Sequence, residues 1–392
     1  MDVELSWGRR RRWHALGLAA LAVVAVAAAV AAHVLWHGET SAEPIVPEGL
    51  AVARRVGRAA DVVAWDGQAW QVVVPPAALP PVDLDEHQLA PTIRALVPAP
   101  GHDAYALLVL RCVPGLEETG GCTAAGEVYD VRTGELTDID DDPVAPIGWL
   151  DDQHLVVAQP VLGQGAVYDL ASGTLTTLPA PDREYTLPRS PDALSAETGS
   201  VAFSSATGEG LMRLASGATT WLGGVPSSHN TPWLAIAPTS GTVAAVRIAE
   251  GRDNPLGAGT LTLHDGTGRQ LESLTPDGFV DHEPAWSADG ELLAFLRTAT
   301  GDVLGVDVES GDDAVPPTSV VVRDVGTGEE RVAATADAGR QSLLIPGAGL
   351  TAVFLQDDGD ALRAFGVDTR GGQPSPLGAA GDEHTALGWA AR

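Results

Sequence analysis

The 392-residue sequence predicts an all-β fold, a single β-propeller of small antiparallel sheets preceded by one transmembrane helix. Two observations carry this prediction. A short turn motif recurs along the chain after residue 60, and a short, nearly continuous apolar strand precedes most of its copies. Self-similarity at a period of about 40 to 50 residues is typical of propellers and solenoids. Because no useful helical period follows residue 40, sheet is the simpler interpretation.

The recurring turn combines a glycine with Asp, Ser or Thr. Glycine adopts positive φ without steric cost, and the polar side chain accepts hydrogen bonds from the turn backbone, which is the chemistry of a short hairpin. Each copy therefore predicts two adjacent antiparallel strands. The seven copies lie at 65–68, 130–135, 169–174, 214–217, 265–268, 324–329 and 368–372.

The apolar strands show continuous rather than alternating hydrophobicity, which indicates that both faces of each strand are covered. A blade packed between two neighbouring blades provides that environment. A tryptophan recurs near these strands, at Trp149, Trp233, Trp286 and Trp389. The strands lie at 105–110, 155–158, 201–203, 243–248, 292–296 and 351–355.

Residues 284–295 read PAWSADGELLAF. This segment resembles the P-x-W-S-P-D-G-x-x-(I/L)-A-F repeat of TolB-like, or WD40-like (PD40-type), β-propellers, with Ala288 in place of the usual proline. The copies near Trp149, Trp233 and Trp389 are degraded. The resemblance covers about residues 83–392 and implies the propeller fold, but it implies little about activity, since one fold hosts many functions.

The first and last strands of the repeat region are expected to share one blade. The turn at 66–67 has no Trp-bearing strand of its own, whereas 385–390 is a Trp-bearing strand with nothing after it. If the C-terminal strand completes the sheet begun by 49–74, the ring has no open edge. This arrangement gives seven four-stranded blades; six or eight remain open because the segment 75–99 is rich in proline.

The first 47 residues carry signals for membrane insertion. A basic cluster at 9–12 precedes an apolar stretch at 15–36, which measures about 33 Å as a helix, close to the hydrocarbon thickness of a bilayer. Because basic residues stay on the cytoplasmic side, we expect 1–14 in the cytoplasm, 15–36 as a signal anchor in the cell membrane, 37–47 as linker and 48–392 as an extracytoplasmic propeller. A cleaved signal peptide is the alternative.

Composition restricts the compartment and the partners. The net charge of −29 argues against nucleic acid, whose binding needs basic patches, and favours cationic, neutral or calcium-bridged partners. The 23 basic residues are all Arg, which excludes lysine Schiff-base chemistry. Abundant Ala and scarce Asn favour a GC-rich bacterium such as an actinobacterium.

Cys112 and Cys122 predict a disulfide in an oxidising compartment; two free thiols or a redox pair are the alternatives.

Three histidines occupy similar places before predicted innermost strands, and acidic residues adjoin them. We expect the connections entering these strands to lie at one rim of the central channel, where imidazoles and carboxylates could bind a divalent metal or a ligand. The alternative is that these side chains cap turns or face solvent. The candidate ligand-binding residues are His229, His282, Glu283 and His384, with Asp281 and Glu383 nearby.

The chain contains no recognisable catalytic set. No G-x-S-x-G nucleophile elbow occurs, and the acidic run at 138–142 departs from an EF-hand at Pro143 and Trp149. We therefore expect a cofactor-free scaffold that binds an envelope protein or peptide and is not an enzyme. The alternative hypothesis is a hydrolase or lyase that uses a divalent metal at the channel mouth.

Overall fold

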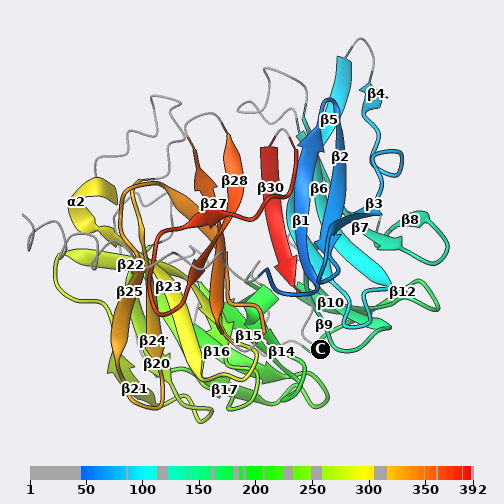
Figure 1. Cartoon of the computed structure of the whole chain (residues 1–392). Helices are drawn as coiled ribbons and strands as arrows, with labels where there is room; N and C mark the ends of the chain where they lie inside the picture. Colours follow the sequence, from blue (N-terminus) through cyan, green and yellow to red (C-terminus); the bar gives the residue numbers. More distant parts are fainter. Residues whose placement is uncertain are drawn as a thin grey trace, which may run out of the picture. The chain divides into compact units, whose positions relative to one another are not determined.

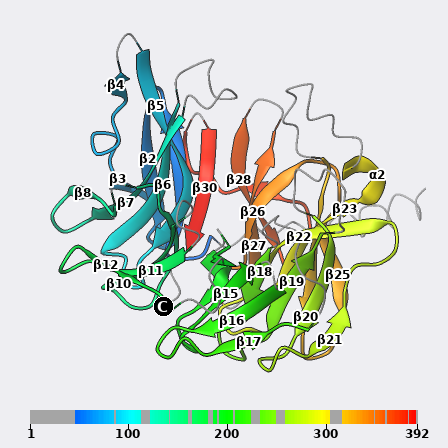
Figure 2. The ribbon, with the colours of Figure 1, turned by 180° about the vertical axis from the view of Figure 1, so that it is seen from behind.

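The protein forms seven antiparallel sheets (Figures 1 and 2). The computed structural model describes one compact unit within Pro44–Arg392. The described residues are 46–84, 87–112, 122–140, 142–159, 164–179, 185–188, 191–205, 208–223, 233–248, 258–303, 316–347, 349–358, 361–381 and 383–389. Within these ranges no helix is long and apolar enough to cross a membrane. The predicted membrane segment 15–36 lies outside them.

Blade 1 joins the two ends of the propeller chain (Figure 1). Its C-terminal strand pairs antiparallel with the first strand of the propeller, which is the closure expected from the turn count. Blade 1 consists of β30 (Glu383–Trp389), β1 (Leu50–Val56), β2 (Ala59–Trp65) and β3 (Trp70–Val74).

Blades 2 to 4 follow in chain order. An additional strand, β4 (Val82–Leu84), pairs with β5 in blade 2, and the first strand of blade 4 is broken by the 3-10 turn η2 (Pro191–Ala193). Blade 2 contains β5 (His87–Pro98), β6 (Ala104–Cys112), β7 (Cys122–Asp130) and β8 (Glu135–Asp138). Blade 3 contains β9 (Ala145–Trp149), β10 (His154–Gln159), β11 (Gln164–Asp169) and β12 (Thr174–Thr177). Blade 4 contains β13 (Tyr185–Thr186), β14 (Leu194–Ser195), β15 (Ser200–Ser205), β16 (Gly208–Arg213) and β17 (Thr219–Trp221).

Blades 5 to 7 complete the ring, and the short helix α2 (Thr300–Val303) follows the second strand of blade 6. Blade 5 contains β18 (Leu234–Ile236), β19 (Val243–Arg247), β20 (Thr260–His264) and β21 (Gln270–Ser273). Blade 6 contains β22 (Phe279–Trp286), β23 (Leu292–Ala299), β24 (Ser319–Asp324) and β25 (Glu330–Ala334). Blade 7 contains β26 (Arg340–Leu344), β27 (Thr351–Asp357), β28 (Leu362–Asp368) and β29 (Ser375–Pro376).

The first strands of the blades form the inner ring. They contact one another in a closed cycle, in the order β30, β5, β9, η2, β18, β22 and β26, and then β30 again. Blades converge toward the axis of a propeller, so small residues are needed there. A Cβ on Gly388 of β30 would lie 2.4 Å from the Leu96 carbonyl oxygen of β5. The closed cycle of seven sheets defines a seven-bladed β-propeller.

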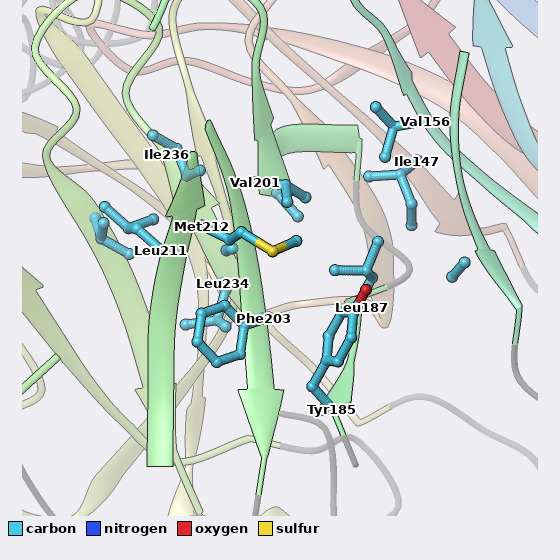
Figure 3. Close-up of a cluster of buried hydrophobic side chains, with 14 of the residues drawn as sticks. Ile147, Val156, Tyr185, Leu187, Val201, Phe203, Leu211, Met212, Leu234 and Ile236 are labelled. Carbon is cyan, nitrogen blue, oxygen red and sulfur yellow. The ribbon is translucent and has the colours of Figure 1, made fainter. Parts of the chain in front are cut away.

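The hydrophobic core lies between the blades. On β23, Leu293 and Phe295 pack in a cluster with blade 5, whereas Ala294 and Leu296 pack in a cluster with blade 7. Figure 3 shows a cluster in which side chains from blades 3, 4 and 5 meet around Phe203. Because alternate residues of one strand face opposite neighbours, both faces are apolar, as the continuous runs in the sequence predict.

The recurring turns join the third and fourth strands of the blades. In the turn between β7 and β8, the Asp130 carboxylate accepts hydrogen bonds from the backbone N–H groups of Arg132 and Thr133, at 2.7 and 3.2 Å. Gly134 closes this turn with a φ of 73°. Local side-chain chemistry therefore fixes these hairpins.

The segment that resembles the family repeat also forms a local turn. The Ser287 hydroxyl donates to Asp289 at 2.6 Å and accepts from the backbone N–H of Leu292 at 2.9 Å. Gly290 has a φ of 72°. The indole N–H of Trp286 donates to the Ala235 carbonyl of the preceding blade at 3.2 Å. The segment thus connects the first two strands of blade 6 and ties that blade to blade 5.

Cys112 and Cys122 are directly opposite in the β6–β7 pair and form a disulfide, which confirms the predicted pairing. The bridge closes the connection between the second and third strands of blade 2. A covalent link of this kind stabilises a fold mainly by restricting the unfolded chain.

Candidate functional site

The central channel opens into a cavity of about 570 Å³, here called the mouth. The mouth lies at the ends of the first strands, and every blade contributes to its lining. Trp149, Trp286 and Trp389 stand around it on three different blades. The mouth is therefore a composite site that exists only when the whole ring is assembled.

The tryptophans of the mouth are held in fixed positions. Trp149 donates its indole N–H to the Val97 carbonyl of the preceding blade at 2.9 Å, and Trp389 donates to the Glu48 carbonyl at 3.3 Å. Since the polar edge of each indole is bonded to backbone, the surface left to the cavity is apolar. The mouth thus has rigid walls that are apolar at the tryptophan positions.

The ionisable residues that line the mouth are all acidic within the described part of the chain. They are Asp151, Asp152, Asp192 and Glu197, and no Arg or His lines this cavity in the described part of the chain. Asp152 accepts a hydrogen bond from the Gly101 backbone N–H at 2.8 Å. Asp151 binds His154, whose pKa is raised by that hydrogen bond. The resulting negative potential favours cationic ligands.

A second cavity of about 160 Å³, here called the inner chamber, adjoins the mouth within the channel. The two cavities share Leu96, Asp192 and Leu344 in their linings. Arg94 of β5 and Glu283 of β22 supply the other charged groups of the chamber.

Bulges in the inner strands bring polar side chains to the inner chamber. Register shifts occur between Ile93 and Ala95, between His282 and Ala285, and between Gln341 and Leu344. A bulge adds a residue and redirects its side chain, and bulges are frequent next to functional sites. The bulge residues Arg94, Glu283 and Ser342 all line the chamber, and the latter two have φ values of 48° and 59°.

Burial makes the two acids of the chamber weak. It raises the pKa of Asp192 to about 7, although the backbone N–H of Trp286 bonds to that carboxylate and opposes the shift. Burial likewise raises the pKa of Glu283 to about 7, against hydrogen bonds from the backbone of Leu343 and Ser342. Removal of a carboxylate from water disfavours its charged form. Both groups therefore exchange protons near neutral pH.

The candidate residues predicted from the sequence do not converge on one site. His282 and His384 lie within β22 and β30, not in the connections before them, because these strands begin earlier than the tryptophan spacing indicated. Glu283 lines the inner chamber. His229 lies outside the described residues. The described residues also include no group of three or more His, Cys, Asp or Glu side chains that could hold a metal ion.

The two candidate histidines within the described residues, His282 and His384, have different environments. His384 Nδ1 accepts from the Ala364 backbone N–H at 2.7 Å, and its Nε2 donates to the Ala379 carbonyl at 2.8 Å, so the ring links blades 1 and 7. His282 is 1% exposed, and neither ring nitrogen has a hydrogen-bond partner in the described region. Burial lowers the pKa of both histidines to about 4.

The neighbouring acids named with these histidines are engaged elsewhere. Asp281 forms an ion pair with Arg297 at 2.8 Å and accepts the Thr275 hydroxyl at 2.6 Å. Glu383 pairs with Arg55 at 3.1 Å. These carboxylates bind to neighbouring strands and are not lining residues of either cavity.

Sequence reasoning missed Arg94 and Asp192. Arg94 interrupts the apolar run 89–98, and a charge in a strand buried on both faces was a usable signal. Asp192 follows a proline in a blade without the recurring tryptophan, and nothing local distinguishes it from a turn residue.

The fold and the channel together define a seven-bladed β-propeller with a two-part central channel. No known family model and no curated protein matches the sequence. Similar solved structures include the hydrazine synthase of Kuenenia stuttgartiensis (12% identity, TM-score 0.47, 74% of this chain and 78% of that chain). An oligogalacturonate lyase in complex with manganese is similar at 14% identity, with a TM-score of 0.48 and 86% of both chains covered. The C-terminal WD40 domain of Sif2 is similar at 12% identity, with a TM-score of 0.46, 84% of this chain and 80% of that chain. These similarities concern the fold alone.

Proposed function

We propose that this protein is a non-catalytic binding module of the bacterial cell envelope, and that the mouth of its channel holds a cationic segment of a protein or peptide. The observation that carries the proposal is the lining of the mouth, where four acidic residues stand among tryptophan, proline and leucine side chains and no basic residue occurs among the described lining residues. A Lys or Arg side chain has the matching chemistry, an apolar stem and a positive head.

The geometry of the mouth favours such a partner energetically. Opposite charges attract more strongly in a cavity with apolar walls than at an open surface, because the effective dielectric constant is lower. Glu197 is exposed, and within the described residues it makes no ion pair or side-chain hydrogen bond. It is therefore available to a ligand without the loss of an internal contact.

The proposed location is the outer side of the cell membrane, with residues 15–36 as a single-pass anchor. The disulfide between Cys112 and Cys122 supports an oxidising compartment, where such bridges persist. Membrane fractionation, followed by protease treatment of spheroplasts, tests this location. External protease is expected to degrade the propeller, and full protection of the propeller would contradict the proposed location.

Calorimetric titration with short peptides tests the binding function. An Arg-rich peptide is expected to bind full-length protein in detergent at low salt, with about tenfold weaker binding after Glu197→Lys and marked weakening at 0.5 M salt. Glu135→Lys, at the exposed first residue of β8, is the matched control and should leave the affinity unchanged. Equal binding of an Asp-rich peptide, or equal effects of the two substitutions, would exclude a cation-selective mouth. Stoichiometric uptake of a divalent metal would favour the metal-enzyme hypothesis instead.

A further inference from the structure

The inner chamber has its own chemistry, distinct from that of the acidic mouth. Its lining contains one cation, Arg94, which makes no ion pair or side-chain hydrogen bond within the described part of the chain. Its two acids are already partly satisfied, because Glu283 accepts from the Leu343 backbone N–H at 3.1 Å and Asp192 accepts from Trp286. Among the described residues, the charged group of this lining without a hydrogen-bond partner is therefore the guanidinium.

The Arg94 side chain is solvent-exposed and lines the chamber, so its guanidinium is accessible to a ligand that enters. A guanidinium presents a planar fork of N–H donors that matches a carboxylate with two parallel hydrogen bonds. Arg94 stands at the bulge of β5, and Ser342 stands at the bulge of β26 with its backbone in the left-handed region. Non-glycine residues rarely adopt that conformation, and it is concentrated at functional sites.

We propose that the inner chamber is a binding site for a small monocarboxylate, whose carboxylate pairs with Arg94 and lies among the polar side chains of Ser342, Asp192 and Glu283. The remaining walls, which include Leu343, Leu387 and Trp233, contact the apolar part of the ligand. This site goes beyond the proposed function, because a partner at the mouth does not require it.

The size of the chamber limits the ligand. Its volume is about 160 Å³, against about 570 Å³ for the mouth. A short-chain acid such as propionate has five non-hydrogen atoms and fits this space. Ligands of that size reach millimolar affinity with ordinary efficiency per atom.

Protonation of the chamber sets the direction of the pH dependence. The titratable groups that face the ligand are Asp192 on η2 and Glu283 on β22, and both have a pKa of about 7. His282 lies beside Glu283, with 3.9 Å between Nδ1 and Oε1, and its pKa of about 4 keeps it neutral above pH 5. The lining residues of β26 and β30 do not titrate. Below pH 7 the chamber is therefore net positive, and above pH 7 the ionised acids repel an anion.

Titration calorimetry on full-length protein in detergent tests the site with propionate as the probe. Propionate is expected to bind at pH 6 with millimolar or better affinity and at least tenfold more weakly at pH 8.5. Propionamide, which has the same shape without the charge, should bind at least tenfold more weakly at pH 6. Comparable binding of propionamide, tighter binding of propylammonium, or no binding of propionate at pH 6 would each overturn the proposal.

Substitutions locate the binding within the chamber. Arg94→Gln should reduce propionate affinity at least tenfold, and Arg132→Gln, in an exposed turn, is the matched control that should not. Glu283→Gln keeps a neutral hydrogen-bond donor and should reduce the loss of affinity between pH 6 and pH 8.5. Unchanged propionate binding in Arg94→Gln would overturn the proposal. If Arg94→Gln does not fold, the comparison of propionate with propionamide on the unmodified protein still decides it.

Discussion

Substitution of His384 by alanine separates a structural role of this histidine from a ligand-binding one. The ring accepts the Ala364 N–H and donates to the Ala379 carbonyl, and it is 2% exposed. The substitution leaves both backbone groups buried without a partner, at about 1–3 kcal/mol each, and also leaves a cavity. We expect a loss of about 3–5 kcal/mol in the free energy of unfolding, measured by urea denaturation at pH 7.5.

The pH dependence makes this prediction specific. Burial lowers the pKa of His384 to about 4, whereas in the unfolded chain it is about 6.5. The neutral ring therefore contributes its full stabilisation above pH 6.5 and loses it as the pH falls toward 4, by about 1.4 kcal/mol per pH unit. The stability gap between the unmodified protein and His384→Ala should narrow by about 3 kcal/mol between pH 7.5 and pH 4.5.

His154→Ala is the matched control. His154 is 43% exposed and pairs with Asp151 at the surface, so its removal should cost less than about 1 kcal/mol. Two results would refute the reasoning: a loss below 1 kcal/mol for His384→Ala, or a gap that stays constant from pH 7.5 to pH 4.5. Either would mean that the ring does not link blades 1 and 7 in solution.

Three further predictions concern the closure, the disulfide and the buried acid. Deletion of 383–389 removes the inner strand of blade 1. The melting temperature should fall by about 10 °C or more, because the pairing with β1 and the burial of Leu387 are both lost. An unchanged melting temperature would contradict the closure. Reduction of the Cys112–Cys122 bridge, which spans a sequence separation of 10, should cost about 2–3 kcal/mol in urea denaturation, and a Cys-to-Ser double variant should not respond to reductant. Glu283→Gln should be as stable as the unmodified protein at pH 4 and more stable by up to about 3 kcal/mol at pH 8. The pKa of Glu283 is raised in the folded protein, so the carboxyl group contributes its full stabilisation below about pH 4.3 and loses it as the pH rises through 7. Equal stabilities at pH 8 would show that the carboxyl is not desolvated.

Much of the fold could be predicted because its signals are local. The hairpin at Asp130 depends on one carboxylate, two backbone N–H groups and one glycine, all within five residues. The apolar run of β23 indicates a strand covered on both faces, and both neighbouring clusters are present. Closure through β30 followed from an incomplete repeat at each end of the chain.

The candidate site could be predicted only in part. Glu283 was named and does line the channel, but its partners were not. His384 was grouped with His282 by spacing from a tryptophan, and spacing does not reveal that His384 bonds to the backbone of two neighbouring segments. Arg94 and Asp192 stand far apart in the sequence and far from Glu283, so no local pattern connects them.

The sequence by itself determined the strands, the turns, the disulfide and the closed ring, because each depends on residues close together or on a repeated pattern. Only the tertiary structure decided which side chains meet in the channel. That outcome depends on the bulges at Arg94, Glu283 and Ser342 and on the break of the blade 4 inner strand at Asp192. A bulge redirects a side chain in a strand that is apolar on both faces, so the hydrophobic pattern of the sequence does not reveal that these four groups meet.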